Sequence, residues 1–194
     1  MTSNGKIAFV YADGRICEEI CLNLARKGYD VGFTLRSREC QADLVGSIES
    51  LGARAIACQM EKSGAEELSR SVIEVAEELG GIDLLIFSAR LTDASPDALL
   101  LDLDESDWDG AMDEARAFFL LLKYALPYLI NKENSRVIVI DTSDAGSAAA
   151  LPDYVLSKTL EAAAGRIAAE FSEFGVSVLY KNIPDGEISR VLPA

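Results

Sequence analysis

Short apolar runs alternate with longer amphipathic segments along the chain, and this alternation most constrains its fold. The apolar runs predict buried strands at 7–11, 30–35, 53–58, 83–87, 136–140 and 176–180. Apolar residues recur at helical spacing at 15–27, 42–51, 64–79, 105–130 and 152–174. Strands that alternate with helices favour parallel pairing through right-handed crossovers. The pattern predicts one α/β domain over residues 1–194, a doubly wound parallel sheet in a three-layer α/β/α arrangement.

The charge balance limits the partners that this fold can have. The chain carries 18 Lys and Arg against 32 Asp and Glu, a formal net charge of -14. Such a chain is repelled by phosphate backbones and by anionic membrane surfaces, so we expect no nucleic-acid and no membrane partner. No apolar segment approaches the roughly 18 residues that span a bilayer, and the first residues lack a secretory pattern. We therefore expect a cytoplasmic protein.

The residue types that bind metals are scarce. The chain has no histidine, which removes Ser-His-Asp catalysis and His-bearing zinc sites. Its four cysteines form no Cys-x-x-Cys pair, and we expect them to be reduced and buried: Cys17, Cys21, Cys40 and Cys58. The acidic run at 101–109 lacks the glycine-centred spacing of a calcium loop and suits the start of a helix. The sequence predicts no metal site.

A serine, a tyrosine and a lysine follow the fifth predicted strand, where ligands of doubly wound sheets bind. Tyr154 and Lys158 are four residues apart near a predicted helix start, so they share one helix face. A lysine ammonium beside a phenol favours the phenolate, which lets the tyrosine transfer a proton near neutral pH. The hydroxyl of Ser143 can hold the carbonyl oxygen that receives this proton. These three residues are the candidate catalytic group.

With this triplet in this place, the chain resembles a short-chain dehydrogenase/reductase along most of its length. Further matches are Leu24-Ala25, Gly81-Ile-Asp-Leu-Leu85, Trp108 and Ser143-Asp-Ala-Gly146. The resemblance implies a Rossmann-like fold and the reduction of a carbonyl, or oxidation of an alcohol, with NADP or NAD. It also implies that Ser143 orients the substrate oxygen, that Tyr154 is the acid/base, and that Lys158 holds the nicotinamide ribose.

The loop after the first predicted strand departs from the family pattern Thr-Gly-x-x-x-Gly-x-Gly. The stretch is one residue shorter, and Gly14 is its only glycine. Asp13 places a carboxylate where backbone amides meet a pyrophosphate. Arg15 can supply a compensating charge, and Arg36 stands where reductases of this family meet the 2′-phosphate of NADP. The candidate cofactor-binding residues are Gly14, Arg15, Arg36 and Lys158, and we expect weak NADP(H) binding that depends on the two arginines.

Two hypotheses remain open from the sequence. The first is a divergent oxidoreductase that uses Ser143, Tyr154 and Lys158 with NADP(H). The second is a non-catalytic protein of the same fold with a degenerate cofactor site, which serves as a dimerising subunit or binds a small anion.

The helix at 105–130 is apolar on more than one face, and the helix at 152–174 is rich in alanine. Both features predict a homodimer or homotetramer built on these two helices.

Overall fold

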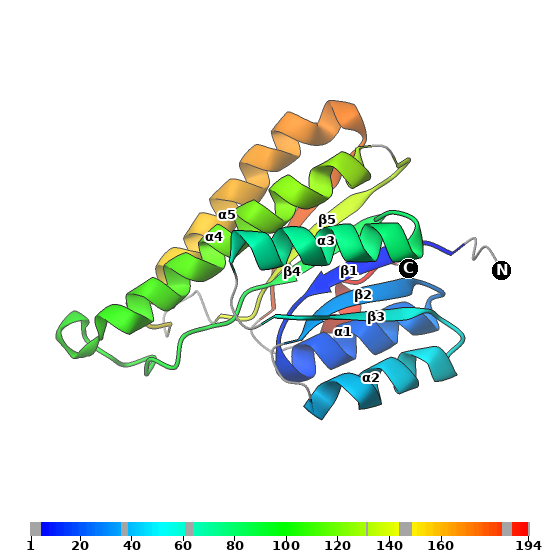
Figure 1. Cartoon of the computed structure of the whole chain (residues 1–194). Coiled ribbons are helices and arrows are strands. Elements are labelled where there is room, and N and C mark those ends of the chain that lie inside the picture. Colours follow the sequence, from blue (N-terminus) through cyan, green and yellow to red (C-terminus); the bar gives the residue numbers. More distant parts are fainter. Residues whose placement is uncertain are drawn as a thin grey trace.

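The structure is a computed structural model that describes residues 5–35, 39–60 (the backbone alone for 39–42), 64–130, 132–143, 149–183 and 188–193. Its six strands form one parallel sheet in the order β3-β2-β1-β4-β5-β6 (Figure 1). The strands are β1 (Ile7–Tyr11), β2 (Asp30–Leu35), β3 (Ala55–Gln59), β4 (Leu84–Ser88), β5 (Arg136–Asp141) and β6 (Ser177–Asn182). The predicted doubly wound α/β sheet is confirmed, and the strand bounds differ from the expected ones by no more than two residues.

Helices cover both faces of this sheet. They are α1 (Gly14–Arg26), α2 (Glu39–Ser50), α3 (Ala65–Leu79), α4 (Glu105–Leu129) and α5 (Leu151–Phe171). In Figure 1, α3, α4 and α5 lie on one face, and α1 and α2 lie on the other. The expected last helix is shorter than predicted, because α5 ends at Phe171 and a 3-10 turn, η2 (Ser172–Phe174), completes the segment.

The core is divided by the sheet into two apolar layers. One layer packs α3, α4 and α5 against side chains such as Phe9 and Phe87, and the other packs α1 and α2 against the opposite strand faces. Every residue of β1 is buried, as expected for a central parallel strand. Gly32 in β2 allows α3 to approach closely, because a Cβ atom there would lie 2.4 Å from Cγ2 of Val75.

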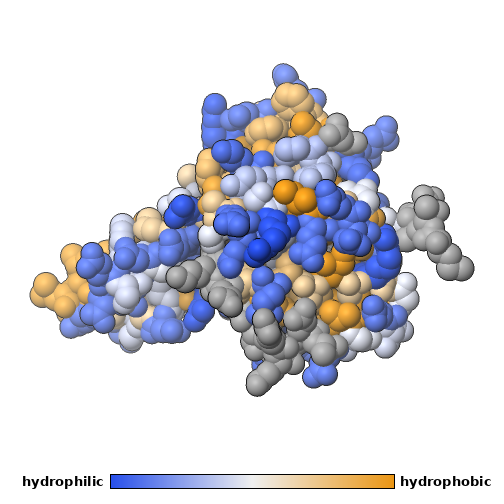
Figure 2. Space-filling view, in the orientation of Figure 1, coloured by the Kyte–Doolittle hydropathy of each residue, from blue (hydrophilic) through white to orange (hydrophobic). Residues whose placement is uncertain are grey.

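The acidic run before α4 has the predicted role at a helix start. The carboxylate of Asp107 accepts the backbone N–H of Asp104 at 3.1 Å, and the acids of this first turn face the positive end of the helix dipole. The segment before α4, which includes the short 3-10 helix η1 (Leu100–Asp102), forms an apolar tip at the N-terminal end of α4 (Figures 1 and 2). The exposed fractions of its leucines are 68% for Leu99, 71% for Leu100 and 94% for Leu101.

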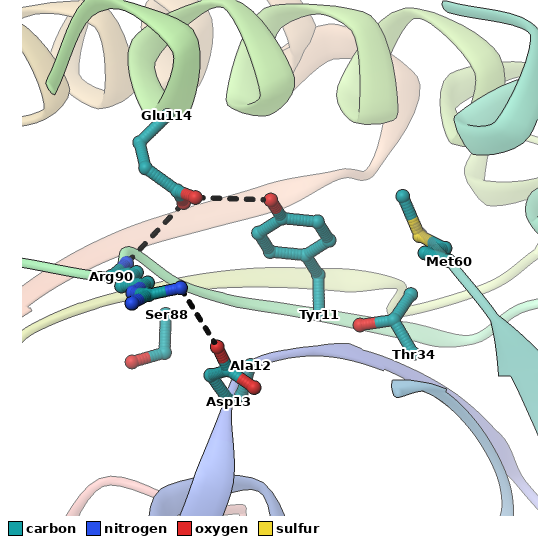
Figure 3. Close-up of a pocket in the computed structure, with 8 residues that line it drawn as sticks. All are labelled: Tyr11, Ala12, Asp13, Thr34, Met60, Ser88, Arg90 and Glu114. Carbon is teal, nitrogen blue, oxygen red and sulfur yellow. Dashed lines mark hydrogen bonds and ion pairs between the residues drawn. The ribbon is translucent and has the colours of Figure 1, made fainter. Parts of the chain in front are cut away.

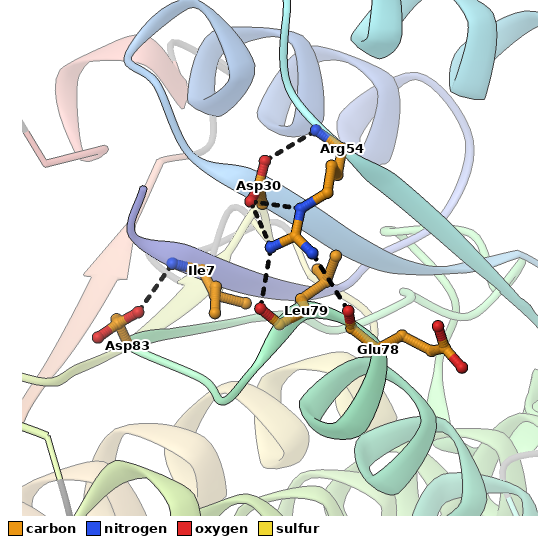
Figure 4. Close-up of polar contacts among 6 residues, drawn as sticks. All are labelled: Ile7, Asp30, Arg54, Glu78, Leu79 and Asp83. Carbon is orange, nitrogen blue, oxygen red and sulfur yellow. Dashed lines mark hydrogen bonds and ion pairs between the residues drawn. The ribbon is translucent and has the colours of Figure 1, made fainter. Parts of the chain in front are cut away.

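The amino ends of the strands are joined by carboxylates (Figure 4). Asp30 accepts hydrogen bonds from the backbone N–H, Nε and one terminal nitrogen of Arg54, at 2.8, 2.9 and 2.8 Å. The same guanidinium donates to the carbonyls of Glu78 and Leu79, which end α3. Asp83 accepts the backbone N–H of Ile7 at 2.8 Å. These contacts fix the edge of the sheet opposite to the one where ligands bind.

Cysteine and membrane predictions can be compared with the described residues. Cys17, Cys21 and Cys58 are buried and free, as expected, whereas the side chain of Cys40 lies outside the described part. Burial raises the pKa of the Cys58 thiol to about 12. The described residues include no metal-binding group of three His, Cys, Asp or Glu. No helix among them has the length and apolarity needed to cross a membrane.

Candidate functional site

The strand order reverses between β1 and β4, and ligands of doubly wound sheets bind at the carboxyl ends of strands beside such a reversal. We call the hollow at the ends of β1 and β4 the switch crevice. Its lining residues come from the ends of several strands and from α4: Tyr11, Ala12, Asp13, Thr34, Met60, Ser88, Arg90 and Glu114. The predicted Ser143 lies in the loop after β5, and Tyr154 and Lys158 lie on α5, which follows that loop.

The structure brings Tyr154 and Lys158 together, as their spacing predicts. Tyr154 lies in the first turn of α5, and the Nζ atom of Lys158 lies 5.9 Å from the centre of its ring. The Lys158 ammonium also forms a 2.9 Å ion pair with Glu161, and this hydrogen bond raises the pKa of the lysine. Both residues of the pair are about half exposed, so Lys158 remains accessible from solvent.

Ser143 lies two residues beyond β5 with only 1% of its surface exposed. Its hydroxyl oxygen makes no hydrogen bond of ordinary geometry within the described part of the chain, although the side chain is close enough to Asp141 to help lower the pKa of that carboxyl. The backbone around it is fixed: its N–H donates to Asp141 at 2.8 Å, and its carbonyl accepts the side-chain amide of Asn182 at 2.8 Å. A buried hydroxyl held this way retains the capacity to donate to a ligand.

A buried carboxylate links the loop of Ser143 to α5. Asp141 accepts the Ser143 N–H, and it also accepts the hydroxyl of Tyr180 at 2.5 Å. The Tyr180 hydroxyl in turn lies 3.1 Å from the hydroxyl of Ser157, which directly precedes Lys158. Burial alone would raise the pKa of Asp141, but the hydrogen bonds from Ser143, Ser157 and Tyr180 outweigh burial and lower it. The carboxylate is therefore an anion that holds β5, β6 and α5 together.

A second carboxylate fixes the start of α5. Asp153, the residue before Tyr154, is 5% exposed. It accepts the backbone N–H of Thr92 at 2.8 Å and the Thr92 hydroxyl at 3.0 Å. Burial raises the pKa of Asp153, and the bonds from Thr92 offset part of that effect. Because Thr92 follows β4, this contact ties the helix turn that carries Tyr154 to the loop beside the switch crevice.

The switch crevice contains a buried acid from α4 (Figure 3). Glu114 is 5% exposed, and its carboxylate accepts the Tyr11 hydroxyl and the backbone N–H of Arg90, both at 3.3 Å. The ring of Tyr11 stacks on Phe87 with centroids 4.9 Å apart. These contacts connect β1, β4 and α4 beneath the crevice. The remaining hollow has room for about one water molecule.

One ion pair joins two of the residues that line the crevice. A guanidinium nitrogen of Arg90 lies 3.9 Å from the carboxylate of Asp13, with side-chain exposures of 51% and 40%. Asp13 is also the N-cap of α1, because its carboxylate accepts the Gly14 N–H at 3.2 Å. Gly14 itself has a φ of 52°, a left-handed conformation that favours glycine. Asp13 therefore occupies the positive end of α1 and draws Arg90 across the crevice.

Three of the four predicted cofactor-binding residues lie on the described helices α1 and α5. Gly14 and Arg15 open α1, where Arg15 is exposed, and Lys158 lies on α5. Arg36 lies outside the described residues. A helix N-terminus with free approach at Gly14, together with the nearby Arg90 guanidinium, has donors that suit a diphosphate. The donor set therefore fits a dinucleotide phosphate, although Asp13 engages both donors in this arrangement.

Sequence reasoning did not assign three residues that the structure places at the site. Glu114 could have been recognised from the helical spacing of the sequence. It is the one acid in a series of otherwise apolar, buried positions of α4, at 111, 114, 118, 121 and 125. Arg90 follows β4 and Asp141 ends β5, but the residues that they contact are distant in the chain and cannot be identified from spacing. The Asp141–Tyr180 contact depends on the pairing of β5 with β6, which aligns Asp141 with Asn182.

The chain is similar to known reductases and dehydrogenases. A family model described as short chain dehydrogenase matches residues 6–181. A 3-oxoacyl-(acyl-carrier-protein) reductase of Staphylococcus aureus is 28% identical over 125 residues, which are 63% of this chain and 50% of that protein. A hydroxynaphthalene reductase-like protein of Metarhizium anisopliae is 28% identical over 155 residues, 78% of this chain and 56% of that protein. The chain spans about half the length of these curated relatives.

Solved structures show the same fold. A short chain dehydrogenase from Burkholderia cenocepacia, solved in complex with NADP, superposes with a TM-score of 0.79 at 27% identity, covering 93% of this chain and 74% of that one. A dehydrogenase/reductase from Sinorhizobium meliloti gives a TM-score of 0.78 at 26% identity, covering 91% and 70%. The family model, which matches residues 6–181, includes both the residues of the switch crevice and the segment that carries Tyr154 and Lys158.

Proposed function

This chain belongs to the short-chain dehydrogenase family of oxidoreductases, and from that premise we propose that it is a cytoplasmic enzyme that reduces a carbonyl, or oxidises an alcohol, with NADP(H). The catalytic group is Ser143, Tyr154 and Lys158. The relatives named as reductases and the NADP complex of a structural neighbour support the reaction class and the cofactor. The substrate is a small molecule with a carbonyl or hydroxyl group.

The observation that carries this proposal is the hydroxyl of Ser143. It is buried, its backbone is held on both sides, and its oxygen makes no hydrogen bond of ordinary geometry within the described residues, although the side chain helps to lower the pKa of the Asp141 carboxyl. A buried hydroxyl is a hydrogen-bond donor that water does not compete for. A substrate oxygen can accept from Ser143, so the position favours a carbonyl ligand at the carboxyl end of β5.

The residues of α5 supply the proton. In carbonyl reduction, the Tyr154 hydroxyl gives its proton to the carbonyl oxygen as that oxygen becomes negative, while Ser143 donates a hydrogen bond to the same atom. The Lys158 ammonium near the Tyr154 ring stabilises the phenolate that remains. Asp153 and Asp141 keep α5 in register with β4, β5 and β6 through Thr92 and Tyr180. Alcohol oxidation uses the same groups with each proton moving in the opposite direction.

When bound, NADP(H) supplies the hydride. Gly14 and Arg15 would hold its phosphates at the start of α1, and Arg36 would meet the 2′-phosphate. Lys158 would hold the nicotinamide ribose. Because Asp13 adds like charge beside the diphosphate, we expect weak binding.

Replacing two buried serines, one in the proposed site and one outside it, tests the proposal. Ser143→Ala should lower the rate of carbonyl-dependent NADPH oxidation by about 100-fold or more, because it removes the donor to the reacting oxygen. The measurement is NADPH absorbance with a panel of small ketones and aldehydes. Ser135→Ala is the matched control, since Ser135 also has a buried hydroxyl that makes no hydrogen bond of ordinary geometry among the described residues but lies before β5, at the opposite edge of the sheet. Equal rates for the wild type and both variants would contradict the assignment.

The second candidate function is a non-catalytic member of the family that serves as a dimerising subunit or binds a small anion. Two observations favour it. The ammonium of Lys158 pairs with Glu161, and the Arg90–Asp13 ion pair lies across the switch crevice. If the protein binds neither NADPH nor NADH, and oxidises neither with any carbonyl of the panel, this second candidate is favoured over the first.

We further infer a homodimer or homotetramer built on the helices at 105–130 and 152–174. Phe119 of α4 is 60% exposed, and it should lie in the contact between subunits. Phe119→Lys should therefore convert the assembly to monomers in sedimentation experiments at micromolar concentration. Ile73→Lys makes the same change on α3, at a side chain that is 41% exposed, and should leave the assembly intact. A wild-type monomer at high micromolar concentration would contradict this inference.

A further inference from the structure

We propose that the carboxylate of Asp13 occupies the place that the diphosphate of the ligand takes in the complex. When the ligand binds, the Arg90 guanidinium leaves Asp13 and binds the diphosphate. The proposal rests on the proposed function only in taking a dinucleotide as the ligand. It assigns to Arg90 a binding role in the switch crevice, and it makes Asp13 a competitor that sets the affinity of the site.

The contacts of Asp13 are those that a phosphate oxygen would make. Its carboxylate accepts the N–H of Gly14 at the start of α1, and it lies 3.9 Å from the Arg90 guanidinium. A backbone amide at a helix N-terminus and an arginine are the donors that bind phosphate in nucleotide sites. A carboxylate that engages both donors competes directly with a diphosphate for them.

Arg90 is held where it can meet a ligand at the switch point. Its backbone N–H donates to the buried carboxylate of Glu114, which also accepts the hydroxyl of Tyr11 (Figure 3). The backbone of residue 90 is therefore anchored to α4 and β1. Its guanidinium remains half exposed and extends toward Asp13 across the crevice. An anchored backbone with a half-exposed cationic end suits a residue that changes partner when an anion arrives.

The Arg90–Asp13 pair is weak enough to be exchanged. Its separation of 3.9 Å is at the outer limit of an ion pair, and both side chains are about half exposed. Exposed pairs of this kind contribute little to stability. A diphosphate carries more charge than one carboxylate and can accept from the guanidinium with two oxygens. The crevice should therefore open for a diphosphate without a large rearrangement of the fold.

Calorimetric titration of the full chain with NADPH, and separately with inorganic pyrophosphate, tests the proposal. Asp13→Asn keeps a good N-cap for α1 but removes the competing charge, and it should lower the Kd for NADPH about tenfold, the equivalent of about 1.4 kcal/mol. Arg90→Gln should raise the Kd about tenfold. In the double variant, the gain from Asp13→Asn should be largely lost, because its benefit requires Arg90. Glu18→Gln removes one exposed acid further along α1 and should change the Kd less than twofold.

The outcomes separate this inference from the proposed function. Tighter binding in Asp13→Asn that disappears in the double variant supports the exchange, even if no carbonyl is ever reduced. Equal Kd values for Asp13→Asn and Glu18→Gln would overturn it, even if the wild type proves to be an active reductase. Pyrophosphate should follow the same order of affinities among the variants; an effect confined to NADPH would place the contact elsewhere on the dinucleotide and would also overturn the proposal.

Discussion

Replacing Tyr154 with phenylalanine should lower the turnover number by about 100-fold to 10,000-fold, because the variant lacks the hydroxyl that gives its proton to the substrate oxygen. The ring should keep its place at the first turn of α5, where Asp153 and Thr92 fix the backbone. The Kd for NADPH should stay within about twofold of the wild-type value, since the phosphate-binding groups lie on α1 and after β4. The measurement is the steady-state rate of NADPH oxidation beside a calorimetric titration.

Tyr128→Phe is the control for this substitution. Tyr128 is half buried on α4, and losing its hydroxyl should leave the turnover number unchanged. If Tyr154→Phe retains more than about a tenth of the wild-type turnover, the proton comes from another group and the assignment is wrong. A loss of turnover accompanied by a comparable loss of NADPH affinity would also contradict the proton-donor role.

Replacing Asp30 with alanine should lower the free energy of unfolding by about 2–4 kcal/mol. Asp30 is 4% exposed and accepts three hydrogen bonds from Arg54, whose guanidinium also binds the last carbonyls of α3 (Figure 4). The substitution leaves the Arg54 backbone N–H without its acceptor and frees the guanidinium. Because the Arg54 side chain is 44% exposed, water relieves part of this cost. Urea denaturation gives the difference.

Asp43→Ala provides the comparison, because Asp43 is exposed on α2 and its loss should change stability by no more than about 0.5 kcal/mol. A loss below about 1 kcal/mol for Asp30→Ala would mean that the Arg54 contacts do not hold this edge of the sheet. The kinetic parameters of Asp30→Ala, measured well below its unfolding transition, should match the wild type, because Asp30 begins β2 and the site lies beyond the opposite ends of the strands.

The order of helices and strands could be predicted from the sequence, since local hydrophobic periodicity carries that information. Element ends were less accurate where tertiary contacts decide them. β6 continues to Asn182 because its last residues pair with Ile140 and Asp141 of β5. α5 ends at Phe171 rather than at the predicted Phe174, and a 3-10 turn leads to Gly175 in a left-handed conformation.

The candidate site was predictable where it depends on local spacing, and less so where it depends on long-range contacts. The four-residue spacing of Tyr154 and Lys158 predicted their proximity, which the structure confirms. The roles of Ser143, Tyr154, Lys158, Gly14 and Arg15 stay predictions, as does that of Arg36. The contact of Arg90 with Asp13 joins loops that are far apart in the chain, so no periodicity could indicate it. The same holds for Asp141 and Tyr180, which meet only because β5 and β6 pair in parallel.

We propose that the switch crevice binds a dinucleotide for chemistry at Ser143, Tyr154 and Lys158. The decisive measurement is calorimetric titration of NADPH and NADH into the wild type and into Asp13→Asn. We expect saturable NADPH binding by both proteins, weak in the wild type and about tenfold tighter in the variant. If neither protein binds either dinucleotide at millimolar concentration, the chain is not a dinucleotide-dependent oxidoreductase, and the proposed function is wrong.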